Sequence, residues 1–341
     1  MLFSIIIPFY NSEQYLFNAI SSALEQYTRN FFYEVIVIND CSTDNSLDIA
    51  NKFSHKGNYV VIDSQVNSGP GSARNKGIEV SQGRYVIFLD SDDYLSDNAL
   101  YNLYEYLELN NYKDDLISYN WKYSPDSCLI NRNYNGGRRD YNFIKMKKKE
   151  LLNAYLSMNM DNSVIYNLIR KSTIVDNDIS FSSGLHEDID YMFKVYYHSN
   201  IVSVFDKVLY YKRDHLSSII NQFTEKNIVG YIRAWKEMFN FLLVENEKVH
   251  ILSLKIGVTG TVGMLISIIC ERNLDGRIDL LNKLYSEWAA NFVEMGENYD
   301  MYLHPLPMKT KYDLLTHYFF NKKKSNCSDL KILKDLCLYL K

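Results

Sequence analysis

Three aspartates within four residues follow an apolar stretch of the chain. They lie in the segment Leu89-Asp90-Ser91-Asp92-Asp93. Neighbouring carboxylates repel one another and destabilise the folded chain unless a cation or a hydrogen-bonding ligand compensates their charge. Hard oxygen ligands suit Mg²⁺ or Mn²⁺, which proteins bind through one or two carboxylates together with ligand phosphates. The segment therefore predicts a divalent-metal site, and a solvated turn that caps the next helix is the alternative.

A second polar segment, Asn39 to Asp44, contains an aspartate that helix capping does not explain. Ser42 or Thr43 can cap a following helix, but Asp40 stands outside that role. The Asp40 carboxylate can accept a hydrogen bond from an imide N–H, as in uracil, and Tyr10 offers a ring on which a base can stack. These residues indicate recognition of a nucleotide base.

A third segment, Asn67 to Gly77, combines glycines with a cation at the start of a predicted helix. Glycines that open a helix can bring backbone N–H groups towards an anion, and Arg74 can pair with a carboxylate or phosphate. The glycine spacing differs from the dinucleotide-binding fingerprint. A plain turn explains this segment equally well.

The elements that must position these residues alternate between buried strands and helices. Short apolar runs predict strands, and helical spacing of apolar residues predicts the helices between them. The expected strands are 2–7, 34–39, 59–63 and 84–89, and the expected helices are 12–27, 42–53, 72–80 and 98–109. Fully apolar strands that alternate with helices imply a mostly parallel sheet covered on both faces, an α/β fold. In such sheets ligands bind beyond the carboxyl ends of the strands, where the three polar segments lie.

Later elements follow a mixed pattern. We expect a loop or hairpin over 121–142, a helix over 148–157, a strand over 164–169, a helix over 187–198 and a strand pair over 201–212. From about residue 221 onward the pattern is helical, and Gly257, Gly260 and Gly263 lie along roughly one face of a predicted helix, where another helix can approach closely.

Together the polar segments resemble the family 2 glycosyltransferases with the GT-A fold. The likeness covers residues 3–100, in which Ile7–Asn11, Asn39–Ser46, Asn67–Gly77 and Asp90–Asp93 come in the family's order and spacing. Cys41 stands where the family pattern usually has glycine. The resemblance implies a GT-A nucleotide-diphospho-sugar transferase fold with a helical C-terminal domain.

The resemblance also implies a nucleotide-diphosphate sugar donor and assigns residues to it. In this assignment Asp40 lies at the base edge, Arg74 near the floor of the donor pocket, and Asp90 towards the ribose or sugar. Asp92 holds the Mn²⁺ or Mg²⁺ on the diphosphate. The donor-binding residues it predicts are Pro8, Tyr10, Asn11, Asp40, Asn67, Gly69, Arg74, Asp90, Ser91, Asp92 and Arg213.

Two further segments resemble later parts of the family pattern. His186-Glu187-Asp188 looks like the Glu-Asp motif at the start of a helix, in which Asp188 matches the catalytic base. Glu187 and Asp190 remain competing bases, and stabilisation of a helix N-terminus is the alternative role. In the segment 210–218, Arg213 is a candidate for phosphate pairing and His215 for approach to the metal.

Length, composition and charge restrict the class of protein. The chain has 341 residues, a net charge of −4 and five scattered cysteines, which exclude a disordered or collagen-like protein and indicate neither a disulfide framework nor a zinc site. We expect no signal peptide, because Met1 to Ile7 runs directly into Pro8. The apolar run Ile256 to Cys270 is shorter than a membrane span. These features predict a cytoplasmic protein.

The charge is unevenly distributed along the chain. Residues 309–341 hold eight lysines against three aspartates, so the rest of the chain is acidic. This distribution argues against a nucleic-acid binder. Residues 322–341 form a basic amphipathic pattern that predicts a peripheral contact with the inner face of the plasma membrane, and packing onto the helical C-terminal domain is the alternative.

The sequence as a whole predicts a metal-dependent, inverting glycosyltransferase. We expect a catalytic domain over 1–220, with a donor-binding half (1–100) and an acceptor-side half (101–220), and a helical domain over 221–341. The expected donor is a UDP-sugar, and the acceptor is a glycan or lipid-linked glycan of a capsule, lipopolysaccharide or exopolysaccharide. The alternatives are a nucleotidyltransferase-like enzyme and a non-catalytic module that binds a sugar nucleotide or glycan.

Overall fold

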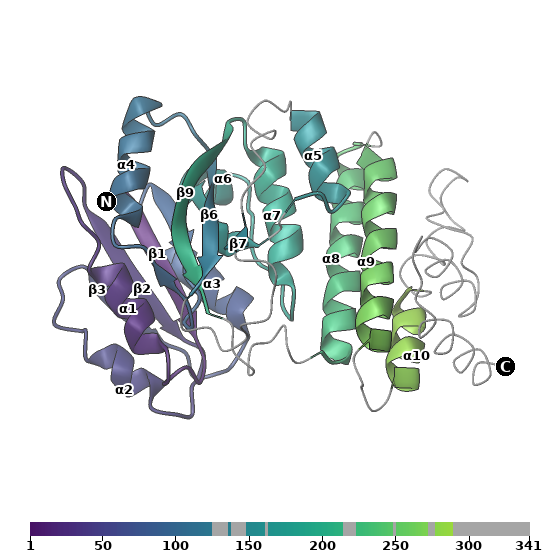
Figure 1. Ribbon diagram of the computed structural model, residues 1–341, viewed down its shortest axis with the longest axis horizontal. Coiled ribbons are helices and arrows are strands. Elements are labelled where there is room, and N and C mark those ends of the chain that lie inside the picture. Colours follow the sequence, from purple (N-terminus) through teal and green to yellow (C-terminus); the bar gives the residue numbers. More distant parts are fainter. Residues whose placement is uncertain are drawn as a thin grey trace. The chain divides into compact units, whose positions relative to one another are not determined.

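The computed structural model describes residues 1–124, 136–137, 148–160, 163–213, 223–247, 250–271 and 277–288. The chain divides into two compact units: residues 1–151 with 162–222, and residues 152–161 with 223–341. Figure 1 shows the sheet and its helices in the first unit, and helices in the second. His215 and the segment 322–341, for which a metal contact and a membrane contact are predicted, lie outside the described residues.

The first unit alternates strands and helices. In chain order its elements are β1 (Phe3–Phe9), α1 (Leu16–Leu24), β2 (Tyr33–Asn39), α2 (Ser46–Asn51), β3 (Tyr59–Asp63), α3 (Pro70–Val80), β4 (Tyr85–Phe88), β5 (Tyr94–Leu95), α4 (Ala99–Leu109), β6 (Leu116–Tyr123), β7 (Gly136–Gly137), η2 (Val164–Tyr166), β8 (Asn167–Arg170), α6 (Lys171–Val175), α7 (Glu187–His198) and β9 (Val202–Lys212). Helix α5 (Lys148–Leu156) begins in this unit and ends in the second.

A single sheet contains all of these strands, in the order β3-β2-β1-β4-β8-β6-β9-β5, with β7 paired to β6. The first four strands are parallel, as predicted. Every residue of β1, β2 and β4 is buried. Strands buried on both faces need apolar side chains throughout, which explains the continuous apolar runs in the sequence.

The strand order reverses beside β1, which pairs with β2 on one side and β4 on the other. Right-handed connections then place α3 on the face opposite α1 and α2. Helix α3 packs Ala73 against Ile36 and Ile38 of β2. Such a reversal opens a crevice beyond the carboxyl ends of the two strands. The chain leaves β1 at Tyr10 and β4 at Leu89, so the predicted binding segments flank this crevice.

Beyond β4 the sheet is mixed. Strand β8 is antiparallel to both β4 and β6, whereas β9 is parallel to β6. The predicted strand pair over 201–212 is wrong, because β9 is one strand whose register against β6 shifts beside Asn120. The predicted strand over 164–169 is corrected as well: a 3₁₀ turn comes first and β8 begins at Asn167.

Two helices begin later than predicted. Helix α1 starts at Leu16 and α2 at Ser46, so Ser12, Ser42 and Thr43 are not N-caps. The Ser12 hydroxyl instead lies 2.7 Å from that of Ser91, and Ser42 accepts a hydrogen bond from the backbone N–H of Asn11. Long-range hydrogen bonds have taken the place of local caps at both positions.

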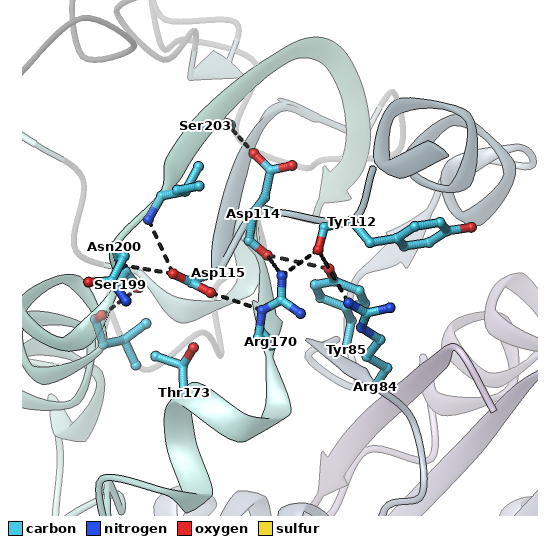
Figure 2. A network of polar contacts seen from close by, with 12 residues as sticks. Arg84, Tyr85, Tyr112, Asp114, Asp115, Arg170, Thr173, Ser199, Asn200 and Ser203 are labelled. Atoms are coloured by element: carbon cyan, nitrogen blue, oxygen red, sulfur yellow. Dashed lines mark hydrogen bonds and ion pairs between the residues drawn. The ribbon is translucent and has the colours of Figure 1, made fainter. Parts of the chain in front are cut away.

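A polar network connects the amino ends of β4 and β6 with the carboxyl end of the antiparallel β8 (Figure 2). Arg170 at the end of β8 pairs with Asp115 at 2.9 Å and donates to the carbonyl of Asp114 at 2.8 Å. The hydroxyl of the buried Tyr85 also points to the Asp114 carbonyl, at 3.3 Å. This network fixes the register of β4, β6 and β8 far from the predicted binding segments.

The second unit is helical where it is described, with α8 (Glu225–Val244), α9 (Ile251–Glu271) and α10 (Arg277–Trp288). A Cβ atom at Gly257 of α9 would overlap the carbonyl oxygen of Leu156 and the ring of Trp235. Among the described residues, a Cβ atom at Gly260 would meet the sulfur of Met158, at 3.2 Å. The predicted close approach along the glycine face of α9 is therefore confirmed at Gly257. Among the described residues, no helix is both long and apolar enough to cross a membrane.

Gly257→Ala should destabilise the protein by about 1–3 kcal/mol, because its methyl group must displace a backbone carbonyl. Gly260→Ala is the matched control in the same helix, and it should be neutral or stabilising by up to about 1 kcal/mol through helix propensity. Urea unfolding followed by circular dichroism measures both. Equal effects of the two substitutions would contradict the close packing at Gly257.

Candidate active site

Three aspartates that follow β4 form one compact acidic group. Each of Asp90, Asp92 and Asp93 offers a carboxylate oxygen, and these atoms lie within 4.8 Å of one another. The backbone N–H of Asp93 donates to the Asp90 carbonyl at 3.1 Å, which closes the turn. Burial and the neighbouring charges of Asp92 and Asp90 raise the pKa of Asp93 well above its usual range.

Arg74 of α3 joins this group to the start of α7. Its guanidinium donates to Asp90 Oδ1 at 2.9 Å and to Glu187 Oε1 at 2.5 Å. Burial opposes the charged form, but the Asp90 and Glu187 carboxylates outweigh it and raise the pKa of Arg74. The side chain is 8% exposed, so water does not replace these partners. Arg74 thus neutralises carboxylates from two segments that are remote in sequence.

Asp188 stands beside the Arg74–Glu187 pair, in the first turn of α7. Burial, followed by the charge of Glu187, raises its pKa to about 7, although the Arg74 charge acts in the opposite direction. A half-buried carboxyl group with a pKa near neutrality can take up a proton from a ligand. The structure therefore brings Arg74, Asp90 and Asp188 together, in agreement with their assignment to one site.

The two competing bases, Glu187 and Asp190, are buried and bound to other protein side chains. Glu187 is buried and paired with Arg74. Asp190 has no exposed surface, accepts a hydrogen bond from the Ser182 hydroxyl at 3.2 Å and lies 3.7 Å from the Lys194 ammonium. Among the three carboxylates of this turn, Asp188 is the most exposed: it is half-buried, whereas Glu187 and Asp190 are buried.

Asp40 holds the segment that leads into α3. Its two carboxylate oxygens accept the backbone N–H groups of Ser68, at 2.9 Å, and Gly69, at 2.7 Å. Gly69 is the N-cap of α3 at a φ of 86°, a backbone region that favours glycine. The sequence did not predict this role, and the contact of Asp40 with a base edge stays a prediction.

The remaining predicted donor residues lie in β1 and in the loops after β1 and β3. Tyr10 is 48% exposed, whereas Pro8 is buried inside β1. The Asn11 side chain accepts the backbone N–H of Thr43 at 2.8 Å. Asn67 is exposed, next to the Asp40 contacts. Their contacts with a donor stay predictions.

Arg213, predicted to pair with a phosphate, is held by protein groups. It is buried, its guanidinium donates to the Asp92 carbonyl at 2.9 Å, and its backbone N–H donates to Asp93 at 2.6 Å. The guanidinium also lies over the rings of Tyr15 and Tyr94, with 4.8 and 5.8 Å to the ring centres. Phosphate pairing by Arg213 stays a prediction, and it would require the side chain to leave these partners.

Sequence reasoning missed Tyr210, a buried residue of β9. Its hydroxyl donates to Asp93 Oδ2 at 2.6 Å and accepts the backbone N–H of Asp90 at 3.2 Å. Nothing in the local pattern distinguishes this tyrosine from its neighbours, because its partners are more than a hundred residues away. Other aromatic side chains of this part of the sheet are buried as well, and Trp121 stacks on Tyr166.

The acidic group has the chemistry that Mg²⁺ or Mn²⁺ requires. Asp90 gives one oxygen to Arg74, and Asp93 gives both oxygens to Tyr210 and Arg213. Asp92 supplies the third carboxylate of the group, and all three are oxygen ligands of the hard type. One or two carboxylates are what these ions usually take from a protein when they also bind a phosphate ligand. These aspartates therefore fit a bound Mg²⁺ or Mn²⁺ ion.

Comparison with known proteins gives concordant matches. The model of the family described as "Glycosyl transferase family 2" matches residues 4–166. The poly(ribitol-phosphate) beta-N-acetylglucosaminyltransferase TarS of Staphylococcus aureus is 34% identical over 229 residues, which is 64% of this chain and 37% of that protein. The chain thus spans only 37% of the length of this curated relative.

A shorter relative is matched over most of its length. The glycosyltransferase GlyG of Streptococcus pneumoniae is 30% identical over 221 residues, which is 62% of this chain and 71% of GlyG. Among solved structures, S. aureus TarS 1-349 in complex with UDP-GlcNAc superposes with a TM-score of 0.68 at 22% identity, and the match covers 98% of this chain and 90% of that one. This superposition confirms the predicted GT-A fold.

Arg74→Met should cost about 3–5 kcal/mol of stability near pH 7.5, because it leaves the carboxylates of Asp90 and Glu187 buried without a cation. Adding Glu187→Gln should recover part of the loss, since one of the two uncompensated charges disappears. The loss should also shrink towards pH 5, because burial raises the pKa of Asp90 and protonation then neutralises that carboxylate. Urea unfolding at the two pH values measures these effects. Additive effects of the two substitutions would contradict the ion pair.

Asp188→Asn should stabilise the protein at pH 8, on the order of 2 kcal/mol. A carboxyl group whose folded-state pKa is raised to about 7 contributes stability below pH 4 that is lost as the pH rises through 7. Asparagine removes this loss, so the gain should be large at pH 8 and small at pH 5. Thermal unfolding over this range measures it. The exposed Asp176→Asn is the matched control, and a wild-type stability independent of pH between 5 and 8 would contradict the raised pKa.

Proposed function

Because the chain belongs to glycosyl transferase family 2, we propose that it transfers a sugar from a nucleotide-diphosphate donor to a hydroxyl group of a growing surface glycan. The chain is a glycosyltransferase, and family membership favours this activity over nucleotidyl transfer and over a non-catalytic binding module. The main support for the proposed mechanism is the position of Asp188. It follows Glu187 in the chain, and Arg74 links Glu187 to Asp90, the first of the aspartates after β4.

In the proposed reaction Asp188 is the general base. Its carboxylate takes the proton of the acceptor hydroxyl as the hydroxyl oxygen bonds to the anomeric carbon. The bond from that carbon to the diphosphate oxygen breaks at the same time, and its electron pair leaves with the diphosphate. This single displacement inverts the anomeric centre. A base with a pKa near 7 matches the working pH, and positioned base catalysis typically contributes about 10²–10⁴-fold.

The other residues of the site bind and orient the reactants in this proposal. Arg74 keeps Asp90 and Glu187 in place, and Asp40 fixes the loop before α3 beside the exposed ring of Tyr10. Asp92 would hold the metal, with Asp90 supplying a second oxygen. When bound, Mn²⁺ or Mg²⁺ stabilises the negative charge of the departing diphosphate.

We infer the donor and acceptor classes from residues and relatives together. A UDP-sugar fits the proposed pairing of Asp40 with an imide N–H, and S. aureus TarS was solved with UDP-GlcNAc. TarS acts on poly(ribitol-phosphate), according to its name. The acceptor class we propose is therefore a cell-surface polymer rich in hydroxyl groups, of which capsular and other exopolysaccharides are further members.

Two substitutions should separate chemistry from donor binding. Asp188→Asn should retain UDP binding while lowering transfer by about 10²–10⁴-fold, because it removes only the base. Asp92→Asn should lose the part of UDP binding that depends on Mn²⁺. Calorimetry with UDP, with and without Mn²⁺, measures binding, and UDP release from the sugar nucleotide that binds best measures turnover. The exposed Asp97→Asn is the control for Asp92→Asn.

A thermal-shift screen of UDP-, GDP- and dTDP-sugars with Mn²⁺ identifies that sugar nucleotide. A shift with none of them would contradict the donor class. A shift only with a non-uridine nucleotide would contradict the base contact of Asp40. Unchanged turnover of Asp188→Asn would reassign the base.

A further inference from the structure

Tyr210 forms a buried link between β9 and the turn that carries the aspartates. The side chain has no exposed surface. Its hydroxyl donates to Asp93 Oδ2 at 2.6 Å and accepts the backbone N–H of Asp90 at 3.2 Å. One oxygen atom thus holds both ends of the turn 90–93, and Asp92 lies between the two contacts.

The carboxylate of Asp93 is turned towards the protein. Its second oxygen, Oδ1, accepts the backbone N–H of Arg213 at 2.6 Å, and the residue is only 2% exposed. The Arg213 guanidinium adds a third contact from the end of β9, to the carbonyl of Asp92 at 2.9 Å. All of these contacts reach the turn from its protein side, and none uses the carboxylate of Asp92.

We propose that Tyr210 is a positioning residue, which holds Asp93 and the backbone of Asp90 so that Asp92 presents its carboxylate to a divalent cation and the donor diphosphate. The inference rests on the proposed function. Within it, Asp93 accepts hydrogen bonds behind the site and is not itself a metal ligand. Groups that orient a metal ligand from behind typically change metal affinity or activity by about 10–100-fold when they are removed.

The contacts with Asp93 and Asp90 depend on the Tyr210 hydroxyl group alone, since a phenylalanine ring would fill the same space without making them. Without that group the Asp93 carboxylate would keep one donor, the backbone N–H of Arg213, and the Asp90 N–H would lose its partner. Burial and the charges of Asp92 and Asp90 already raise the pKa of Asp93, and the Tyr210 hydrogen bond acts against that rise. The turn therefore depends on the hydroxyl to keep its acidic residues in one arrangement.

A matched pair of substitutions tests the proposal. Tyr210→Phe and Tyr85→Phe each remove the hydroxyl of a fully buried tyrosine in the same sheet. The Tyr85 hydroxyl, however, donates to backbone carbonyl groups at the amino ends of β4 and β6 (Figure 2). Manganese binding in the presence of UDP is measured by electron paramagnetic resonance of the free ion. Tyr210→Phe should bind Mn²⁺ about 10–100-fold more weakly, and Tyr85→Phe should bind it as the unaltered protein does.

The dependence of UDP release on Mn²⁺ provides a second readout. Tyr210→Phe should need a correspondingly higher Mn²⁺ concentration for half-maximal turnover, and saturating Mn²⁺ should restore most of the rate. Asp93→Asn, which keeps an acceptor for Arg213, should weaken Mn²⁺ binding to the same extent as Tyr210→Phe. It should not abolish binding as Asp92→Asn does.

Three results would overturn the proposal. The first is unchanged Mn²⁺ affinity in Tyr210→Phe, and the second is an equal loss in Tyr85→Phe, which would indicate a general effect of lost stability. The third is a loss in Asp93→Asn as complete as that in Asp92→Asn, which would make Asp93 a ligand. If the unaltered protein itself binds no Mn²⁺ in the presence of UDP, the proposed metal fails and this inference fails with it.

Discussion

The site depends on one buried cation. Arg74 reaches from α3 to Asp90, which follows β4, and to Glu187, which begins α7. A guanidinium suits this position because its fork presents several N–H donors in fixed directions and keeps its charge when buried. The space around it is equally restricted. A Cβ atom on Gly71 would lie 2.8 Å from the Ser182 carbonyl oxygen and 2.9 Å from Glu187 Cγ, so only glycine lets α3 approach this closely.

The backbone around this cation adopts conformations that local preference disfavours. Asn11, Cys41 and His186 have φ values of 47°, 63° and 60°, in the left-handed region. They lie at the end of β1, after β2 and at the N-cap of α7, next to the groups of the candidate site. Strained residues persist where the surrounding contacts determine them, and they gather at functional sites. The left-handed φ of Cys41 is a conformation that glycine adopts without steric cost.

The sequence predicted the parts of the site that depend on local pattern. Continuous apolar runs marked β1, β2 and β4, and the polar segments after β3 and β4 contain the predicted site residues Arg74, Asp90 and Asp92. It failed where a partner is distant. Nothing near Arg74 announces Glu187, 113 residues away, and nothing near Asp93 announces Tyr210, 117 residues away. The helix starts at Ser12 and Ser42 were wrong for the same reason, because the hydroxyls that would cap a helix bind another loop instead.

The balance of charge in this arrangement supports a metal-dependent reaction. The turn 90–93 and the first turn of α7 carry six carboxylates, those of Asp90, Asp92, Asp93, Glu187, Asp188 and Asp190. The cationic side chains beside them in the described part of the chain are Arg74, Lys194, Lys212 and Arg213. Raised pKa values at Asp90, Asp93 and Asp188 reflect burial together with this excess of negative charge.

Both arginines of the site are held by protein groups in this arrangement. Arg74 is buried between two carboxylates, and Arg213 is held between two rings and the Asp92 carbonyl. A departing diphosphate would add negative charge where the protein already has too much of it. In the proposed reaction a divalent cation held by Asp92 would offset both charges at once, because it would stabilise the ionised carboxylates and the leaving group together. The cost of folding this acidic turn and the proposed capacity to expel a diphosphate would then have the same physical origin.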